Sequence, residues 1–242
     1  MLLKLAMWTD VEEYLAKRKD VIIPVGSTEQ HGPGGPIGTD LIVAEELASE
    51  LGEERRAMVA PALPYALSSL HGAFPGTISL RPMTLAAVLR DTLVSLAEQG
   101  FDRFFIVNAH PATGGLLEAV CGQLQADRPN VRCLVASWWQ LSEVRAEILE
   151  LFGTREGFQG TPAELSLVRK FYPRAALDLP PPPNFAPVVE LRAFSPADFR
   201  ARYPDGRVGS DPSLAQGGAG DRLFSIAIRA LIELHRRLVE EP

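Results

Sequence analysis

Short apolar runs alternate with longer segments of helical periodicity through the first 140 residues. The apolar runs lie at residues 21–25, 58–60, 103–107 and 132–136. Runs of this length and composition are typical of strands covered on both faces. Apolar residues recur at helical spacing in segments 41–51, 85–96 and 116–125. The alternation predicts an α/β fold, a three-layer α/β/α sandwich with helices on both faces of a mostly parallel central sheet.

Residues typical of helix ends flank two of these helical segments. Asp40 precedes the first and Thr84 the second, as N-terminal capping residues do, while Gly52 and Gly100 follow them. The last third of the chain is less regular. A four-proline run at 180–183 predicts a stiff extended loop, residues 209–220 predict a turn-rich loop, and a final amphipathic helix is expected from Asp221. No repeat or linker divides the chain, so we predict one domain over residues 1–242.

Composition narrows the function classes. The chain has 242 residues, of which 46% are hydrophobic, enough to bury a full core and to exclude intrinsic disorder. A net charge of −6 disfavours nucleic acid as the main partner and docking to anionic membranes. No apolar run approaches the ~20 residues of a membrane span, and no signal sequence is apparent, so a cytoplasmic protein is expected. The two cysteines, Cys121 and Cys133, are expected to be buried, inert thiols.

One polar segment follows directly on the first predicted strand. It comprises residues 26–33, GSTEQHGP, and residues 38–40, GTD, and it contains Glu29, His31 and Asp40. In an extended chain, residues two apart point to the same side, so Glu29 and His31 are expected to face one site. Asp40 would enter that site from the start of the following helix.

A second polar segment follows the strand that ends at residue 107. Its sequence, NAHPATGG at residues 108–115, contains His110. Because ligand sites gather outside the carboxyl ends of parallel strands, His110 is expected to meet Glu29, His31 and Asp40. Histidine nitrogens with carboxylate oxygens suit zinc, manganese or iron better than calcium. This set of side chains predicts a binuclear site in which one carboxylate bridges two metal ions.

Four segments in a fixed order resemble the motifs of one family. They are residues 26–40, which contain GSTEQHGP and GTD, residues 74–80 (FPGTISL), residues 108–110 (NAH) and residues 209–215 (GSDPSLA). The chain resembles the creatininase family, creatinine amidohydrolase and related amide hydrolases, over roughly residues 20–230. The resemblance implies a three-layer α/β/α fold, usually assembled into homohexamers, with two divalent metal ions that hydrolyse C–N bonds in cyclic or linear amides.

The resemblance also implies a ligand set. Glu29, Asp40 and His110 correspond to ligands of one metal ion, and His31 and Asp40 to ligands of the second, so that Asp40 bridges. A metal-bound hydroxide would be the nucleophile, because two cations lower the pKa of a shared water. Zinc is the expected metal, with manganese or iron as alternatives.

The sequence departs from the family pattern at three places. A glutamate that binds metal in creatininase is replaced by Ala112, and the Gly-Gly-Asn of relatives without that glutamate is replaced by residues 111–113, PAT. The family histidine that resembles a proton shuttle is replaced by Gln159. Glutamine does not exchange a proton near neutral pH. The glutamate of the same motif is present as Glu164, which we expect to be the remaining metal ligand.

These departures leave the proton donor to the leaving nitrogen open. The candidates are Glu29, Glu164 and His71, and the predicted catalytic set is Glu164, His71 and Gln159. Aromatic side chains at Trp138 and Trp139, with Thr77 of the FPGTISL motif, are predicted to bind substrate. His235, near the end of the last helix, is expected to be structural or exposed.

Three functions remain open. The first is a metal-dependent amidohydrolase that cleaves a non-peptide C–N bond in a small amide other than creatinine. The second is creatinine amidohydrolase proper, which converts creatinine into creatine. The third is a non-catalytic family member that acts as a binding or structural subunit. Gln159 and Ala112, which replace functional residues of the family, favour this alternative.

Overall fold

The structure, a computed structural model, describes residues 1–175, 181 and 194–240. Its sheet has four parallel strands in the order β2-β1-β3-β4. They are β1 (Asp20–Val25), β2 (Met58–Val59), β3 (Arg103–Asn108) and β4 (Arg132–Ser137). In the register, Phe104 lies between Val21 and Cys133. The four predicted strands are confirmed, each to within one residue at either end.

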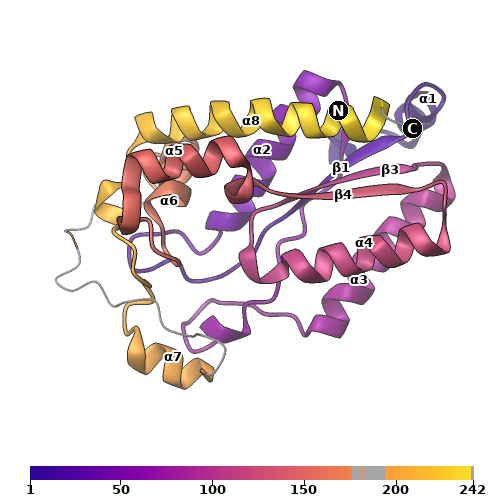
Figure 1. Cartoon of the computed structure of the whole chain (residues 1–242). Coiled ribbons are helices and arrows are strands. Elements are labelled where there is room, and N and C mark those ends of the chain that lie inside the picture. The colour runs from indigo at the N-terminus through magenta and orange to yellow at the C-terminus, as the bar shows by residue number, and fades with distance from the viewer. Residues whose placement is uncertain (176–180, 182–193, 241–242) are drawn as a thin grey trace.

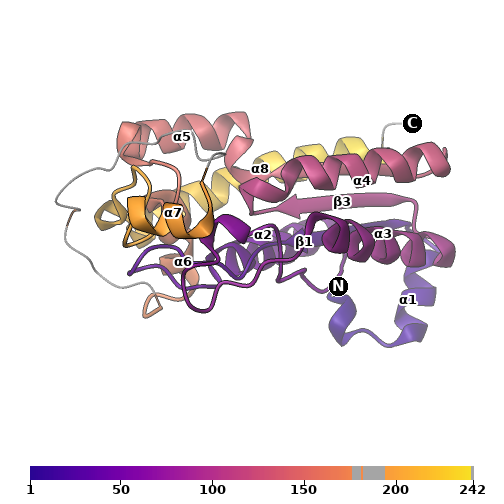
Figure 2. The same cartoon turned by 90° about the horizontal axis from the view of Figure 1, so that it is seen from below.

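Helices cover both faces of the sheet, as predicted (Figure 1). One face carries α2 (Thr39–Arg55), α5 (Ser142–Phe152), α6 (Pro162–Phe171) and α8 (Gly217–Glu240). The other carries α1 (Trp8–Leu15), α3 (Pro82–Gln99) and α4 (Gly114–Asp127), and α3 and α4 run side by side across it (Figure 2). Side chains of β3 alternate between the two cores: Phe105 and Val107 face the first group, Phe104 and Ile106 the second.

Helix α2 differs from its predicted boundaries at both ends. It begins at Thr39, so Asp40 lies within its first turn rather than at the cap, and it continues past Gly52 to Arg55. Gly52 serves packing instead of termination, since a Cβ there would lie 2.3 Å from Cγ2 of Val59 on β2. The first turn of α2 thereby holds the Asp40 carboxylate at the carboxyl end of β1.

Two other helices begin earlier than predicted. Helix α3 starts at Pro82, whose fixed φ suits the first turn and whose missing N–H costs nothing there. Helix α8 starts at Gly217 rather than Asp221, within the segment predicted to be a loop. Gly220 permits this, because a Cβ there would lie 2.1 Å from the backbone oxygen of Ser166 on α6.

Three of the prolines at 180–183 lie outside the described residues, as do all but one residue of 176–193.

The two cysteines correct one prediction. Cys121 on α4 and Cys133 on β4 form a disulfide, with Cα atoms 5.6 Å apart, instead of remaining free thiols. Helix α4 packs back on the strand that follows it, which brings together two residues separated by 12 positions. Spacing alone does not show which face of a helix meets the next strand.

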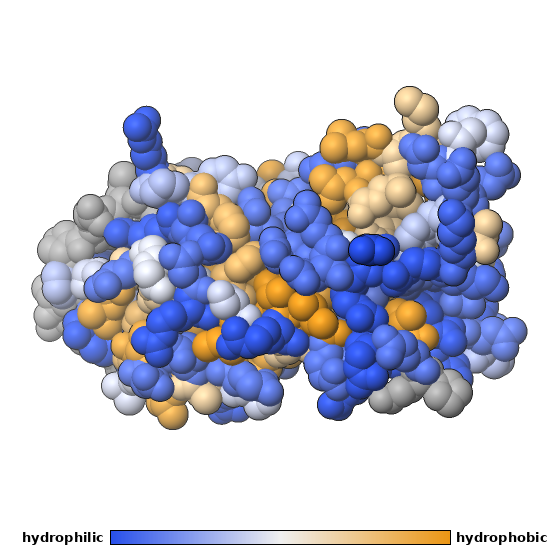
Figure 3. Space-filling view, turned by 90° about the horizontal axis from the view of Figure 1, so that it is seen from above, coloured by the Kyte–Doolittle hydropathy of each residue, from blue (hydrophilic) through white to orange (hydrophobic). Residues whose placement is uncertain are grey.

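Helix α8 forms the outer layer above the sheet and shows a mainly hydrophilic face with apolar groups between (Figure 3). Its buried side includes Leu223, Ala227 and Leu231. A short helix, α7 (Pro196–Arg202), buries Phe199 in a small separate cluster with Tyr203 and Val208. Among the described residues, no helix has the length and apolarity required to cross a membrane.

Candidate metal centre

The carboxylate of Asp40 lies between two histidines at the carboxyl end of the sheet. Its Oδ1 is 3.1 Å from Nε2 of His31, and its Oδ2 is 2.8 Å from Nδ1 of His110. All three side chains are buried. His31 comes from the loop after β1 and His110 from the residues after β3, while Asp40 comes from α2. The structure therefore brings together the two polar segments that were predicted to meet.

Each histidine is oriented by a backbone carbonyl on its other nitrogen. Nδ1 of His31 lies 2.9 Å from the carbonyl oxygen of Glu29, and Nε2 of His110 lies 3.1 Å from that of Leu67. When these nitrogens donate to the carbonyls, Nε2 of His31 and Nδ1 of His110 carry the lone pairs that face Asp40. Histidines that bind metals are held in this way, with the second ring nitrogen donating to a carbonyl or carboxylate.

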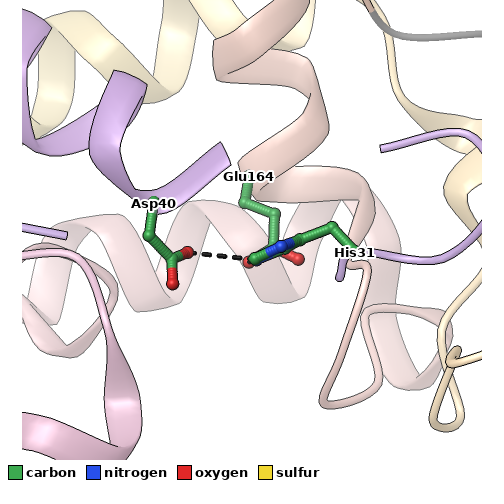
Figure 4. A group of neighbouring side chains, drawn as sticks. All are labelled: His31, Asp40 and Glu164. Carbon is green, nitrogen blue, oxygen red and sulfur yellow. Dashed lines mark hydrogen bonds and ion pairs between the residues drawn. The ribbon is translucent and has the colours of Figure 1, made fainter. Parts of the chain in front are cut away.

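Glu164 approaches the same place from α6, with its two oxygens in different roles. Oε1 accepts from the backbone N–H of Thr161, which completes a capping box at the start of α6. Oε2 lies 3.9 Å from Nε2 of His31. Figure 4 shows His31, Asp40 and Glu164 pointing toward one another. The helix cap and the approach to His31 thus use different atoms of one side chain.

Glu29 is buried beside this group and is held by two side chains. Its Oε1 accepts from Nε2 of Gln159 at 2.9 Å and lies 3.3 Å from Nε2 of His71. Nε2 of Gln30 donates to Nδ1 of His71, so the proton of His71 is on Nε2, toward Glu29. Oε2 of Glu29 is buried, has no hydrogen bond to any described residue, and lies 3.6 Å from Nε2 of His110.

Charge in this cluster is balanced by histidine protons. Burial opposes protonation of His31 and His110, but the adjacent carboxylates outweigh it and raise the pKa to about 10 and about 9. Burial also raises the pKa of Glu164, to about 7, and that of Glu29. The two histidines outweigh burial at Asp40 and hold its pKa below the ordinary value. The three carboxylates form ion pairs only with histidine in the described chain.

These features fit a metal ion. His31, Asp40 and Glu164 offer one nitrogen and two oxygens within 4.8 Å of one another. In the described chain the carboxylates pair with no lysine or arginine, so the charge that balances them comes from histidine protons. A divalent cation held by His31, Asp40 and Glu164 would take the place of the proton of His31.

Two cavities open beside the cluster. The first, about 440 Å³ and termed here the tryptophan cavity, is lined by Glu164, Trp138, Trp139, Arg145, Glu156, Phe158 and Pro111, among others. The second, about 550 Å³ and termed the histidine cavity, is lined by Glu29, His71, His110, Leu67, Leu70, Phe158, Phe194 and Pro111, among others. Thr77 lines neither cavity: its Oγ1 accepts from the backbone N–H of Gln30.

A model of the creatininase family, described as creatinine amidohydrolase, matches residues 4–235. The chain belongs to the creatininase family. A mycofactocin precursor peptide peptidase of Mycolicibacterium smegmatis is 30% identical over 224 residues, which cover 90% of this chain and 84% of the relative. Creatinine amidohydrolase of Pseudomonas putida is 26% identical over 249 residues, covering 95% and 94%.

Solved structures agree on the fold of this creatininase-family chain. A crystal structure of creatinine amidohydrolase superposes with a TM-score of 0.82 at 23% identity, over 100% of this chain and 98% of the other. The α/β sandwich predicted from the alternation of strands and helices is therefore the creatininase fold.

Several residues that hold the site were not singled out from sequence. Ser27 donates its Oγ to Oδ2 of Asp40 at 2.8 Å, and Oδ1 of Asn108 accepts from the backbone N–H of His110. Gln30 fixes His71. All three stand in the two polar segments after β1 and β3. Their polarity next to buried strands was the available signal, but the partner of each depends on the tertiary fold.

Proposed function

We propose that this chain is a metal-dependent amidohydrolase that cleaves a non-peptide C–N bond in a small cyclic or linear amide. The observation that carries the proposal is the buried cluster of three carboxylates whose ion pairs, in the described chain, involve only histidine. Family membership supplies the reaction class, and the cavities beside the cluster supply room for a substrate.

Two divalent ions are proposed, with Asp40 between them. His31, Asp40 and Glu164 would hold one, and Glu29, Asp40 and His110 the other. Two related creatininase structures, one described as a Zn–Zn type mutant and one as creatininase with Mn, support divalent metals, with zinc preferred here and manganese or iron as alternatives. When bound, such ions supply Lewis-acid activation of water and of the amide carbonyl.

The chain's own side chains have separable tasks in this proposal. Asp40 directs one carboxylate oxygen toward His31 and the other toward His110, so it would serve both proposed metal ions, and Ser27 keeps the carboxylate in that orientation. Gln159 donates to Oε1 of Glu29, and Nε2 of His71 lies 3.3 Å from the same oxygen, so both act as positioning residues for Glu29. Burial and the charges of His31 and His110 lower the pKa of His71 to about 3, so it stays neutral at pH 7 and is a poor proton acceptor.

Proton delivery to the leaving nitrogen is then assigned to a carboxyl group. Gln159 does not exchange protons, and His71 stays neutral with its pKa lowered to about 3 by burial and by the charges of His31 and His110. Glu29 lines the histidine cavity and Glu164 the tryptophan cavity, so each carboxyl group lies beside the space for a substrate, and whichever of the two does not bind metal can hold the proton.

Metal analysis and turnover test this proposal together. Protein purified without chelator is expected to contain zinc, manganese or iron in stoichiometric amount and to release amine from small formamides and cyclic amides. His110→Ala, with unchanged circular dichroism, is expected to lose both metal and turnover. Metal-free protein that is also inactive after reconstitution would favour the non-catalytic alternative.

The same assay decides between related substrates. Creatinine turnover above that of other amides would identify the second function considered from sequence, creatinine amidohydrolase proper. Cleavage of peptides alone would point to the activity named for the Mycolicibacterium smegmatis relative. A homohexameric assembly and a cytoplasmic location remain part of the proposal, and size-exclusion chromatography with light scattering tests the first.

A further inference from the structure

The two cavities share two lining residues, here termed their shared edge, beside the proposed metal ligands. Pro111 and Phe158 line both of them, with Glu164 on the side of the tryptophan cavity and Glu29 and His110 on the side of the histidine cavity. An amide placed at this edge would therefore extend one substituent into each cavity. Together the cavities have the size that drug-sized ligands occupy, far more than a five-membered ring needs.

The backbone at the shared edge is held by hydrogen bonds and close packing. Phe158 is 47% exposed, yet its backbone N–H donates to Val208 at 2.8 Å, and the next residue, Gln159, accepts from the N–H of Val208. Gly157, with φ 69°, lets this loop touch its neighbour, since a Cβ there would lie 2.3 Å from the backbone of Gly209. The Phe158 ring is thus presented by a fixed backbone rather than by a free loop.

The cavities differ in the chemistry of their walls. Above Glu29, His71 and His110, the histidine cavity is walled by apolar side chains, including Leu67, Leu70 and Phe194. Among the described residues, no lysine or arginine lines it, so a carboxylate placed there would lie near Glu29 without a cation from this part of the chain. An apolar group suits this cavity.

The tryptophan cavity has one cationic side chain among its described lining residues, together with the carboxyl groups of Glu156 and Glu164. Arg145, on α5, lines it together with Trp138 and Trp139. In the part of the chain that the structure describes, the guanidinium of Arg145 has no carboxylate partner: nearby Glu147 pairs with Arg222 instead. Arginine binds carboxylates through two parallel hydrogen bonds, and an indole wall beside it suits a flat, partly apolar group.

We propose that the substrate is a linear amide of the N-acyl amino acid class, with its apolar acyl group in the histidine cavity and its carboxylate on Arg145. The inference rests on the proposed amidohydrolase function. In the reaction, water oxygen bonds to the carbonyl carbon, the C–N bond breaks, and the nitrogen takes up one proton, which yields a carboxylic acid and a free amino acid. Arg145 is a specificity residue and does not touch the scissile bond.

Paired probes test the carboxylate subsite. N-benzoylglycine and N-benzoylethanolamine contain the same scissile amide, but only the first has a carboxylate. The wild-type ratio of their kcat/KM values is expected to favour N-benzoylglycine by about tenfold or more. Arg145→Ala should bring the ratio near one and Arg145→Glu below one, while Arg229→Ala, an exposed arginine of α8 outside both cavities, should leave the ratio unchanged.

A second pair tests the apolar subsite. N-benzoylglycine is expected to exceed N-acetylglycine in kcat/KM by about tenfold or more, and Phe158→Ala should reduce that preference. Two results would overturn this inference and leave the proposed function standing. One is turnover of creatinine or formamides by an enzyme that prefers N-benzoylglycine neither to N-benzoylethanolamine nor to N-acetylglycine. The other is a ratio of N-benzoylglycine to N-benzoylethanolamine kcat/KM values that Arg145→Glu does not change. Absence of turnover on every amide after metal reconstitution would instead remove the proposed function.

Discussion

Strand β1 carries a buried acid–histidine cluster at each of its two ends. At the amino end, Asp20 receives two hydrogen bonds of 2.8 Å from Arg18 and lies 3.2 Å from Nε2 of His235. At the carboxyl end, Asp40 lies between His31 and His110 without an arginine. Both aspartates are almost fully buried.

The difference lies in what compensates the carboxylates. In the amino-end cluster, a bidentate arginine neutralises Asp20, and Arg55 donates to Nδ1 of His235. The carboxyl-end cluster adds Glu29 and Glu164, and in the described chain its carboxylates pair only with histidine. Similar residue types thus serve stability at one end and, in our proposal, metal binding at the other.

The largest expected effect comes from Asp40→Asn. The amide keeps the shape but removes the charge that both metal positions would share, so turnover should fall by about 10³-fold or more. Elemental analysis should show loss of metal with an unchanged circular dichroism spectrum. Asp20→Asn is the matched control and should keep its metal. Loss of metal in Asp20→Asn but not in Asp40→Asn would contradict the assignment of the metal site to the carboxyl end.

Asp20→Asn is expected to act on stability instead. Loss of the carboxylate leaves the half-buried guanidinium of Arg18 without its partner, which should cost about 3 kcal/mol at pH 7. Burial opposes ionisation of Asp20, but His235 and Arg18 outweigh it and hold its pKa below the ordinary value. A carboxyl group whose pKa is lowered by folding stabilises the fold above pH ~4, and this stabilisation is lost as the pH falls further. Urea unfolding at pH 7 and pH 3 should therefore show a difference between variant and wild type that shrinks at pH 3.

Ser27→Ala should weaken metal binding without abolishing it. Ser27 touches the carboxylate of Asp40 and lies outside the proposed ligand set. Loss of such an outer hydrogen bond typically lowers metal affinity by about 10- to 100-fold. Competition with a zinc chelator measures the change, and Ser225→Ala, on the exposed side of α8, serves as the control. Equal affinities of the Ser27 and Ser225 variants would argue against the proposed role of Asp40.

Glu240→Gln should have the smallest effect. Glu240 is exposed and pairs with Arg55 at the rim of the amino-end cluster. Exposed ion pairs contribute little, so the unfolding midpoint should stay within error of the wild type. A clear loss of stability would show that the amino-end cluster depends on the exposed Arg55–Glu240 pair as well as on the Asp20–Arg18 pair.

The two clusters also differ in how far sequence could predict them. Glu29, His31 and Asp40 stand close together in a glycine-rich segment after a strand, and strand-end geometry predicts that His110 joins them. Asp20 and His235 are 215 positions apart and belong to a strand and a helix with no local motif, so only the packed fold brings them together. His235 was expected to be structural or exposed, and it is buried.

Other contacts escaped prediction because they depend on rotation and register. The disulfide between Cys121 and Cys133 requires α4 to present one particular face to β4. Thr77 belongs to a recognisable motif, but its hydroxyl turns toward the backbone of Gln30 instead of a cavity. Strand and helix periodicity specifies layers well, whereas side-chain partners across layers depend on register that periodicity does not contain.

Calorimetric titration of zinc into chelator-treated protein measures whether the Asp40 cluster binds metal. We expect two zinc ions to bind per wild-type chain, and this binding to be lost in Asp40→Asn but not in Asp20→Asn. Absence of stoichiometric binding to the wild-type chain, or binding that Asp40→Asn leaves unchanged, would contradict this expectation.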